Sequence, residues 1–247
     1  MKIRLDTLLY QKGYFESRSK AAAAIAEGRV SVNGVIVQKA AFPADEDAEI
    51  AVLKGGAFVS RAYRKLNAAL DGFGVNPAGE TAVDIGASTG GFTQCLLERG
   101  AKKVYAVDVG SGQLHPSLKN DPRVVNMENT NARTLTKKDF QEEITLAVMD
   151  VSFISQSKIY PAVSDILADG GKLISLIKPQ FEAGREYIGK NGIVKDKSGK
   201  LIEKIMENLT KSAADCGLFR KSFMPSPITG ADGNQEYLAL FIKERNQ

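Results

Sequence analysis

The sequence predicts an α/β fold, with a mostly parallel sheet covered by helices and a small basic unit in front of it. From residue 61 onward, short apolar runs alternate with segments of helical spacing. This alternation favours parallel strands joined by helices that cover both faces of one sheet. Basic side chains instead gather in residues 1–40, where seven of them stand against three acidic ones. Such a module suits attraction to a phosphate backbone, although an ordinary solvated surface explains the charge equally well.

Length and composition limit the classes of protein to consider. The 247 residues are enough for one α/β domain and a small additional unit, and 43% apolar and 25% charged residues are typical of a soluble globular protein. No apolar run approaches the ~20 residues of a membrane helix, and the N-terminus lacks the apolar core of a signal peptide. One histidine and two cysteines without metal-ligand spacing favour neither a metal site nor disulfides. We therefore expect a cytoplasmic protein without a membrane or metal partner.

Residues 1–58 are expected to form a small α+β domain. A first helix begins around Asp6, the candidate N-cap, and a second helix covers residues 21–27 and ends at Gly28. Residues 29–37 then alternate between apolar and polar side chains about an Asn-Gly pair. That pattern is a strong signal for a β-hairpin.

Residues 59–247 are expected to form the larger domain. It begins with a helix from residue 61 to residue 73. The candidate strands are apolar runs at residues 82–85, 104–107, 124–127, 146–149 and 173–177, followed by two final strands at 221–224 and 236–242. Helices are predicted between them, including residues 158–167 and the amphipathic segment 200–216.

A glycine-rich turn follows the first of these strands, at residues 86–91. Glycine lets the backbone approach a ligand closely, and the N–H groups at the start of the next helix favour polar or anionic groups. The acid Asp108 ends the second strand, where an adenosine ribose binds in β-α-β units. We therefore expect a cofactor that contains adenosine. A nicotinamide cofactor is less favoured, because the turn fits the Gly-x-Gly-x-x-Gly spacing poorly.

Other polar side chains stand where the strands end, which is where open α/β sheets bind ligands. Asn131 follows the third strand and could hydrogen-bond an adenine edge, while Asp150 and Lys178 follow the fourth and fifth strands. A lysine after an apolar strand is costly unless it is paired or used in chemistry. Lys65 and Glu236 are candidates to act beside it. On spacing alone, a purely structural Asp150–Lys178 ion pair explains the pattern equally well.

These segments resemble a known family. Residues 2–53 are similar to the ribosomal protein S-four type RNA-binding domain, through residues 4–6, 17–21 and 28–34. The whole chain resembles the TlyA (hemolysin A) family, which couples that module to an FtsJ-type RNA ribose methyltransferase dependent on S-adenosylmethionine. The matching segments are residues 60–66, 84–92, 150–155 and 177–182. Thr89 stands where the FtsJ branch usually has proline, and Ser88-Thr89 matches the TlyA branch.

The resemblance implies a class I, Rossmann-like methyltransferase fold with a seven-stranded sheet, and it implies roles for particular residues. The catalytic tetrad would be Lys65, Asp150, Lys178 and Glu236. Lys178 would take the proton of a ribose 2′-hydroxyl, Lys65 and Glu236 would orient that hydroxyl, and Asp150 would hold Lys178 near the sulfonium methyl. The cofactor contacts would be Asp84, Gly86, Ala87, Ser88, Thr89, Gly90, Gly91, Phe92, Asp108, Asn131 and Asp150. The phosphate-binding residues would be Arg4, Arg18, Lys20 and Arg29, near the predicted helix ends.

The implied partner is rRNA or a ribosomal subunit, with cytidine as the methylated nucleotide and no metal in the reaction. Two other functions compete with this one. A non-catalytic rRNA-binding or assembly factor with a vestigial cofactor fold would bind rRNA without methyl transfer, and the full set of polar strand-end residues counts against it. A hemolysin, as the family's name suggests, would need a lytic or membrane-spanning segment that the sequence does not offer. The sequence predicts no oligomeric state.

Overall fold

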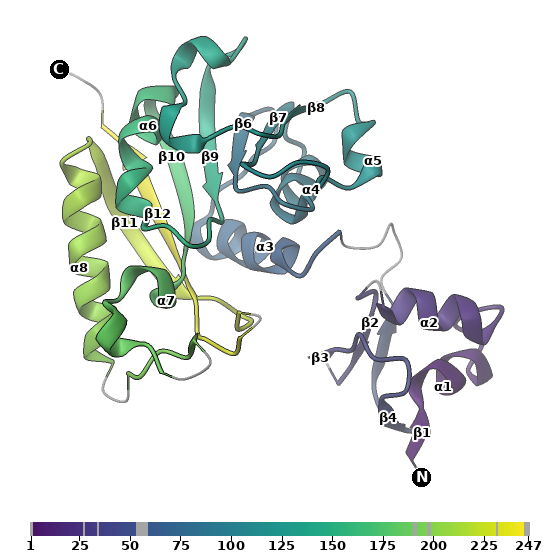
Figure 1. Ribbon diagram of the computed structural model, residues 1–247. Helices are drawn as coiled ribbons and strands as arrows, with labels where there is room; N and C mark the ends of the chain where they lie inside the picture. Colours follow the sequence, from purple (N-terminus) through teal and green to yellow (C-terminus); the bar gives the residue numbers. More distant parts are fainter. Residues whose placement is uncertain are drawn as a thin grey trace. The chain divides into compact units, whose positions relative to one another are not determined.

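The computed structural model describes residues 2–26, 28–33, 35–52, 59–189, 192–196, 199–230 and 232–244. The chain divides into two compact units, Met1–Arg61 and Ala62–Gln247 (Figure 1). Within the described ranges, no helix combines the length and the apolar content that crossing a membrane requires.

The first unit is a small α+β structure. Its elements are β1 (Lys2–Arg4), α1 (Leu5–Gln11), α2 (Arg18–Ala26), β2 (Val30–Val32), β3 (Val35–Ile36), β4 (Pro43–Asp45) and β5 (Ile50–Val52). β1 pairs antiparallel with β4, and β2 lies between β3 and β5. The predicted hairpin is thus the β2–β3 pair, although Gly34 of its turn lies outside the described residues. Leu5, Leu8 and Leu9 on one side of α1 pack with Ile25 of α2 in the core.

Asp6 is not the N-cap that the sequence predicts. α1 begins at Leu5, so its N-cap is Arg4, two residues earlier, and Asp6 is a buried residue of its first turn. The main chain explains the difference. The N–H groups of Leu5 and Asp6 donate to the carbonyl oxygens of Phe42 and Ala40, at 2.8 and 3.1 Å. The start of the helix therefore needs no side-chain cap there, and the Asp6 carboxylate is available for other contacts.

The second unit is built on the predicted seven-stranded sheet, and its strand order is β11-β12-β10-β9-β6-β7-β8. The strands are β6 (Thr81–Ile85), β7 (Lys103–Val107), β8 (Val124–Met127), β9 (Ile144–Met149), β10 (Leu167–Ile177), β11 (Leu218–Pro225) and β12 (Tyr237–Lys243). Neighbouring strands from β10 to β8 are parallel, whereas β12 runs antiparallel to both of its neighbours. The carboxyl ends of β6, β7, β8, β9 and β10 consequently meet along one edge of the sheet.

Helices pack on this sheet in two groups (Figure 1). The α-helices are α3 (Ala62–Phe73), α4 (Gly91–Glu98), α5 (Pro116–Lys119), α6 (Tyr160–Ile166), α7 (Pro179–Glu182) and α8 (Lys200–Ala214). α3 packs beside α4, and α6 packs beside α8. α8 buries Leu201, Ile205 and Leu209, which recur at helical spacing and join the large core cluster with β9 and β10.

The largest difference from the prediction in this unit concerns one helix and the strand that follows it. The helix expected over residues 158–167 is split into a 3₁₀ turn, Gln156–Lys158, and the shorter α6. β10 begins at Leu167 and continues through Gly170 and Gly171, which the sequence places between elements. The ladder with β9 shifts register between Leu167 and Lys172. A bulge therefore accommodates the two glycines inside the strand.

Candidate active site

The glycine-rich turn joins β6 to α4, and two of its glycines are required by close packing. Gly86 has φ +81°, and a Cβ added there would lie 2.4 Å from the carbonyl oxygen of Asp150. Gly90 has φ +99°, and a Cβ there would lie 2.2 Å from Leu118 Cδ1 of α5. Gly86 thereby lets the loops after β6 and β9 come together at one place. Gly90 is explained by packing alone, without any ligand.

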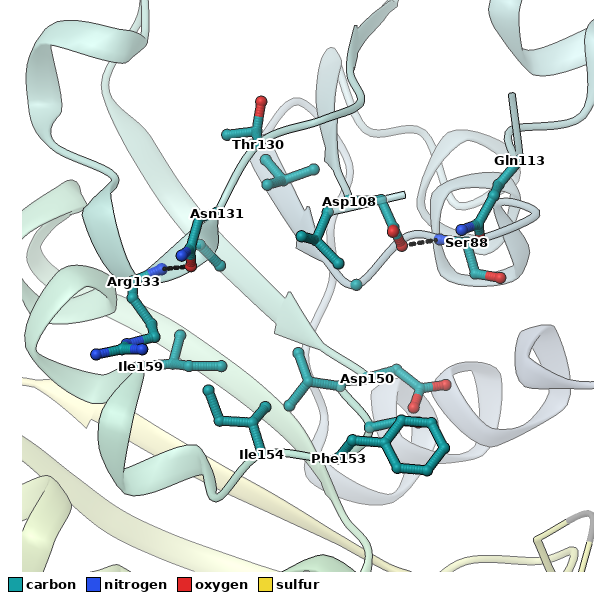
Figure 2. Close-up of a pocket in the computed structure, with 16 residues that line it drawn as sticks. Ser88, Asp108, Gln113, Thr130, Asn131, Arg133, Asp150, Phe153, Ile154 and Ile159 are labelled. Atoms are coloured by element: carbon teal, nitrogen blue, oxygen red, sulfur yellow. Dashed lines mark hydrogen bonds between the residues drawn. The ribbon is translucent and has the colours of Figure 1, made fainter. Parts of the chain in front are cut away.

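A cavity of about 520 Å³ opens where β6, β7, β8 and β9 end. The predicted cofactor residues that line it are Gly86, Ser88, Asp108, Asn131 and Asp150. The remaining ones do not, and Asp84 and Phe92 are buried behind the turn. Thr130, of the segment 128–131 expected near the adenine, also lines the cavity, and residues that sequence reasoning missed complete the lining, including Gln113, Arg133 and Phe153 (Figure 2). Their only signal in the sequence is that each lies a few residues after a strand end.

Asp108 is fixed at the end of β7 by backbone donors. Its Oδ2 accepts from the N–H of Ser88 at 2.8 Å, the bond marked in Figure 2, and its Oδ1 accepts from the N–H of Gly110 at 2.7 Å. The first bond ties the carboxylate to the glycine-rich turn. Asp108 is only partly buried and lines the cavity, so its oxygens remain accessible for the hydroxyl groups of a ribose.

Asp84 lies within β6 and is completely buried. Its Oδ2 accepts from the Thr93 hydroxyl at 2.7 Å, whereas its Oδ1 has no hydrogen-bond partner among the described residues. Burial raises the pKa of this carboxyl to about 7, and the negative charges of Asp150 and Asp108 act in the same direction. A buried carboxylate oxygen without a partner is costly, which marks this place as one that a cation or a donor would stabilise.

The raised pKa of Asp84 predicts that the protein loses stability as the pH rises. The folded protein retains a proton that the unfolded chain releases near its ordinary pKa of 3.8, so the free energy of unfolding falls as the pH rises toward about 7. We expect a loss of roughly 3 kcal/mol between pH 5 and pH 8. Urea unfolding measured at both pH values tests this expectation. Asp84→Asn, which cannot ionise, should remove most of the difference, and an unchanged difference in that variant would contradict the assignment.

The four predicted tetrad residues form two ion pairs. Lys178, directly after β10, places its Nζ 2.6 Å from Asp150 Oδ1 and 2.9 Å from Ser152 Oγ. Lys65 of α3 pairs with Glu236, the residue before β12, and the two are 8% and 2% exposed. Lysine and glutamate are almost never this buried unless they are paired. The structure thus brings the four residues together as two separate pairs, of which the Lys178–Asp150 pair lies next to the turn through Asp150.

The loop after β9 is tied to the segment after β10 at three successive places. The Lys178 contacts with Asp150 and Ser152 come first. The ring of Phe153 then lies 4.9 Å from the ring of Phe181. Glu182 finally accepts from the Ser155 hydroxyl at 2.7 Å and from the N–H of Gln156 at 2.9 Å. These links fix the geometry of the Asp150–Lys178 pair.

Phe153 is unusual in two respects. It is 90% exposed, and its φ of +63° lies in the left-handed region that bulky residues avoid. Such a conformation persists only where the surroundings enforce it, which is common at binding sites. A large aromatic ring consequently stands in solvent at the rim of the cavity.

The four predicted phosphate-binding residues of the first unit do not form a single cluster. Arg4 and Arg18 both contact Asp6. Lys20 forms an exposed ion pair with Glu16, and Arg29 is half-buried. Asp6 therefore brings Arg4 and Arg18 together. Lys20 and Arg29 are not part of that cluster.

The sheet order, the glycine-rich turn after β6 and the acid at the end of β7 define an α/β methyltransferase of the Rossmann-like class. Comparison with known proteins places the chain more narrowly. The model of the FtsJ-like methyltransferases matches residues 58–243, and that of the S4 domain matches residues 3–50. The chain belongs to the FtsJ-like methyltransferases, in the TlyA (hemolysin A) group.

Individual relatives cover nearly the whole chain. Hemolysin A of Brachyspira hyodysenteriae is 47% identical over 241 residues, which is 97% of this chain and 100% of the relative. The 16S/23S rRNA (cytidine-2′-O)-methyltransferase TlyA of Mycobacterium tuberculosis is 39% identical over 238 residues, 96% of this chain and 88% of the relative. The solved structure of a Streptococcus thermophilus protein that carries the name hemolysin is 43% identical, with a TM-score of 0.75, and the match covers 99% of this chain and 90% of that one.

Proposed function

We propose that this protein transfers a methyl group from S-adenosylmethionine to the 2′-hydroxyl of a cytidine ribose in rRNA. The observation that carries the proposal is that the predicted tetrad residues form two ion pairs, Lys178–Asp150, whose aspartate lines the cavity, and the buried Lys65–Glu236. The TlyA relative of Mycobacterium tuberculosis, whose name states this activity, supports the choice of reaction and nucleotide. Because its substrate would be rRNA or a ribosomal subunit, we also propose that the protein is cytoplasmic.

The cavity fits S-adenosylmethionine in charge and size. Its volume of about 520 Å³ lies in the ordinary range for small-molecule sites. Asp108 and Asp150 place negative charge in the lining of the cavity, and Asp84 Oδ1 behind the turn has no hydrogen-bond partner among the described residues. That field suits the sulfonium and ammonium groups of the cofactor, and Asp108 is placed for its ribose. When bound, the cofactor supplies an electrophilic methyl group on a good leaving group.

Lys178 is the proposed general base, which takes the proton of the ribose 2′-hydroxyl. In the neutral form, its amine donates two N–H groups and keeps one lone pair. Ser152 Oγ accepts one of those N–H groups at 2.9 Å, and Asp150 Oδ1, 2.6 Å from Nζ, supplies the counter-charge once the amine is protonated. The lone pair of the neutral amine is the acceptor for the proton of the ribose hydroxyl. Lys65 and Glu236 orient that hydroxyl, and positioning supplies most of the acceleration.

RNA binding is assigned to the S4 unit and to the rim of the cavity. Arg4 and Arg18 of the S4 unit expose more than half of their side chains, which suits contact with backbone phosphates. Phe153 offers an exposed aromatic face beside the cavity. Aromatic faces stack on unpaired bases and contribute about 1–3 kcal/mol per base.

Replacing Phe153 by alanine is expected to weaken the interaction with RNA and not the interaction with the cofactor. Loss of one stacked base predicts a rise in KM for rRNA of about 5- to 100-fold. The dissociation constant of S-adenosylmethionine should stay within about threefold, since the ring stands at the rim. Phe153→Tyr is the control, because it keeps the stacking face. An equal loss of cofactor affinity in Phe153→Ala would contradict this role.

The decisive test of the proposed function is methyl transfer itself. Purified protein, labelled S-adenosylmethionine, and either protein-free rRNA or isolated ribosomal subunits are mixed, and the modified nucleotide is mapped by mass spectrometry. We expect one or more 2′-O-methylcytidines. Tight rRNA binding without any methyl transfer would instead support the assembly-factor alternative, and methylation of a base would contradict the ribose assignment.

A further inference from the structure

In the S4 unit, one buried carboxylate joins two exposed guanidinium groups. Asp6 is 5% exposed. Its Oδ2 lies 3.0 Å from Arg4 Nη2 and 3.1 Å from Arg18 Nη2. The side chains of Arg4 and Arg18 are 55% and 53% exposed. A buried acid thus links two cations that come from the starts of different helices and that face solvent.

The shared oxygen fixes the two cations close together. Both Nη2 atoms lie within 3.1 Å of Asp6 Oδ2, so they are no more than about 6 Å apart. Arg4 also donates its Nε to Asp6 Oδ1 at 3.1 Å, which makes its contact bidentate. Charge-assisted N–H···O bonds are ~2.8 Å long, so the oxygens of a single phosphate can bridge two donors at such a separation.

The Asp6 carboxylate is well suited to hold this arrangement. Its Oδ1 accepts from the N–H of Thr7 at 2.8 Å, and its neighbours Leu5, Leu8 and Leu9 are buried in the core. The hydrogen bonds from Arg4 hold the pKa of Asp6 well below its usual range, with help from Arg18, so the group stays charged at working pH. Two guanidinium groups at this distance repel each other, and the carboxylate between them offsets that repulsion.

Donors remain for a ligand after these contacts. A guanidinium group carries five N–H donors. Arg4 contacts Asp6 through Nε and Nη2, and Arg18 contacts it through Nη2. The three groups together keep one net positive charge. A prearranged pair of planar donors with a net positive charge matches a phosphate diester better than separate flexible lysines do.

We propose that Asp6 is a positioning residue for RNA binding, which holds Arg4 and Arg18 as one fork for a single backbone phosphate. The identity of the polymer rests on the proposed function. The competing explanation is that Asp6 only ties the start of α1 to the start of α2. In that case Asp6 would matter for the stability of the unit and not for its affinity for RNA.

The test uses the full chain and a fluorescently labelled rRNA fragment, with affinity measured by anisotropy at several salt concentrations. Asp6→Asn is compared with Asp47→Asn, a change at an exposed acid of the same unit. Each variant makes the unit more positive by one charge, so general attraction predicts unchanged or tighter binding for both. The fork instead predicts that the two variants differ from each other in their affinity for RNA. Asp47→Asn should bind equally well or slightly better, whereas Asp6→Asn should bind about tenfold more weakly, with a shallower salt dependence.

A second variant protects the test against loss of folding. Arg4→Lys keeps the charge but cannot make the bidentate contact, and it should weaken binding by about threefold or more. If thermal melting shows that Asp6→Asn unfolds the unit, the RNA affinity of Arg4→Lys is the measurement that tests the fork. Binding by Asp6→Asn or Arg4→Lys as tight as that of the unchanged chain would overturn the fork. Failure of the unchanged chain to methylate rRNA would overturn the proposed function separately, because the binding comparison does not depend on methyl transfer.

Discussion

Replacing Lys178 by alanine is expected to lower the rate of methyl transfer by about 10²- to 10⁴-fold, the range lost when a general base is removed. The variant lacks the amine that Asp150 and Ser152 hold at 2.6 and 2.9 Å. Without it, the proton of the ribose hydroxyl has no fixed acceptor. The measurement is a single-turnover rate with saturating rRNA and S-adenosylmethionine, so that changes in binding do not enter.

Two controls separate this chemical role from binding and charge. The dissociation constant of S-adenosylmethionine, measured by calorimetry, should change little in Lys178→Ala, because Lys178 does not line the cavity. Lys221→Ala removes an exposed lysine of β11 and should leave the rate unchanged. Lys178→Arg keeps a positive charge that cannot act as a base near neutral pH, so it should be almost as slow as the alanine variant. Methyl transfer by Lys178→Ala at a normal rate would exclude Lys178 as the base.

Breaking the Lys65–Glu236 pair is expected to have the largest effect on stability. Glu236→Gln leaves the ammonium group of Lys65 buried without its counter-charge, because only 8% of that residue is exposed. Removing one partner of a buried ion pair costs about 3–5 kcal/mol. We expect a loss of that order in the free energy of unfolding, measured with urea at neutral pH. A loss below about 1 kcal/mol would show that the pair is hydrated in solution.

The double variant Lys65→Met with Glu236→Leu separates stability from catalysis. Replacing both partners with apolar residues of similar volume leaves no unpaired charge, so most of the lost stability should return. Methyl transfer should not return, since neither side chain can orient a hydroxyl group. A stable and fully active double variant would mean that the pair is structural only.

The sheet could be predicted from the sequence because its strands are short, continuous apolar runs. β6, β7 and β9 are buried on both faces, which produces a signal that needs no knowledge of partners. β1, β4 and β5 carry no such signal. Each has three residues, and β1 and β4 form only because they pair with each other across the unit. Pairing over that separation is a tertiary effect that local patterns do not contain.

Site residues could be predicted from the sequence where they directly follow the end of a strand, and less well elsewhere. Asp108, Asp150 and Lys178 come directly after apolar runs, so topology alone brings them to one edge. Phe153 carries no comparable signal, because its importance lies in exposure and in a positive φ angle. The sequence predicts only a local capping role for Asp6, whereas its partner Arg18 is twelve residues away and begins a different helix.

The position of β12 has a consequence for the order in which this protein becomes active. β12 follows β11 in the sequence, yet it occupies an interior place between β10 and β11. Lys65 and Glu236, which this strand brings together, are 171 residues apart in the sequence. At ribosomal synthesis rates of about 5–20 residues per second, roughly ten seconds or more pass between the synthesis of Lys65 and that of Glu236. The nascent chain can therefore fold its S4 unit early, but it cannot complete the proposed catalytic tetrad until Glu236 and β12 have been synthesised.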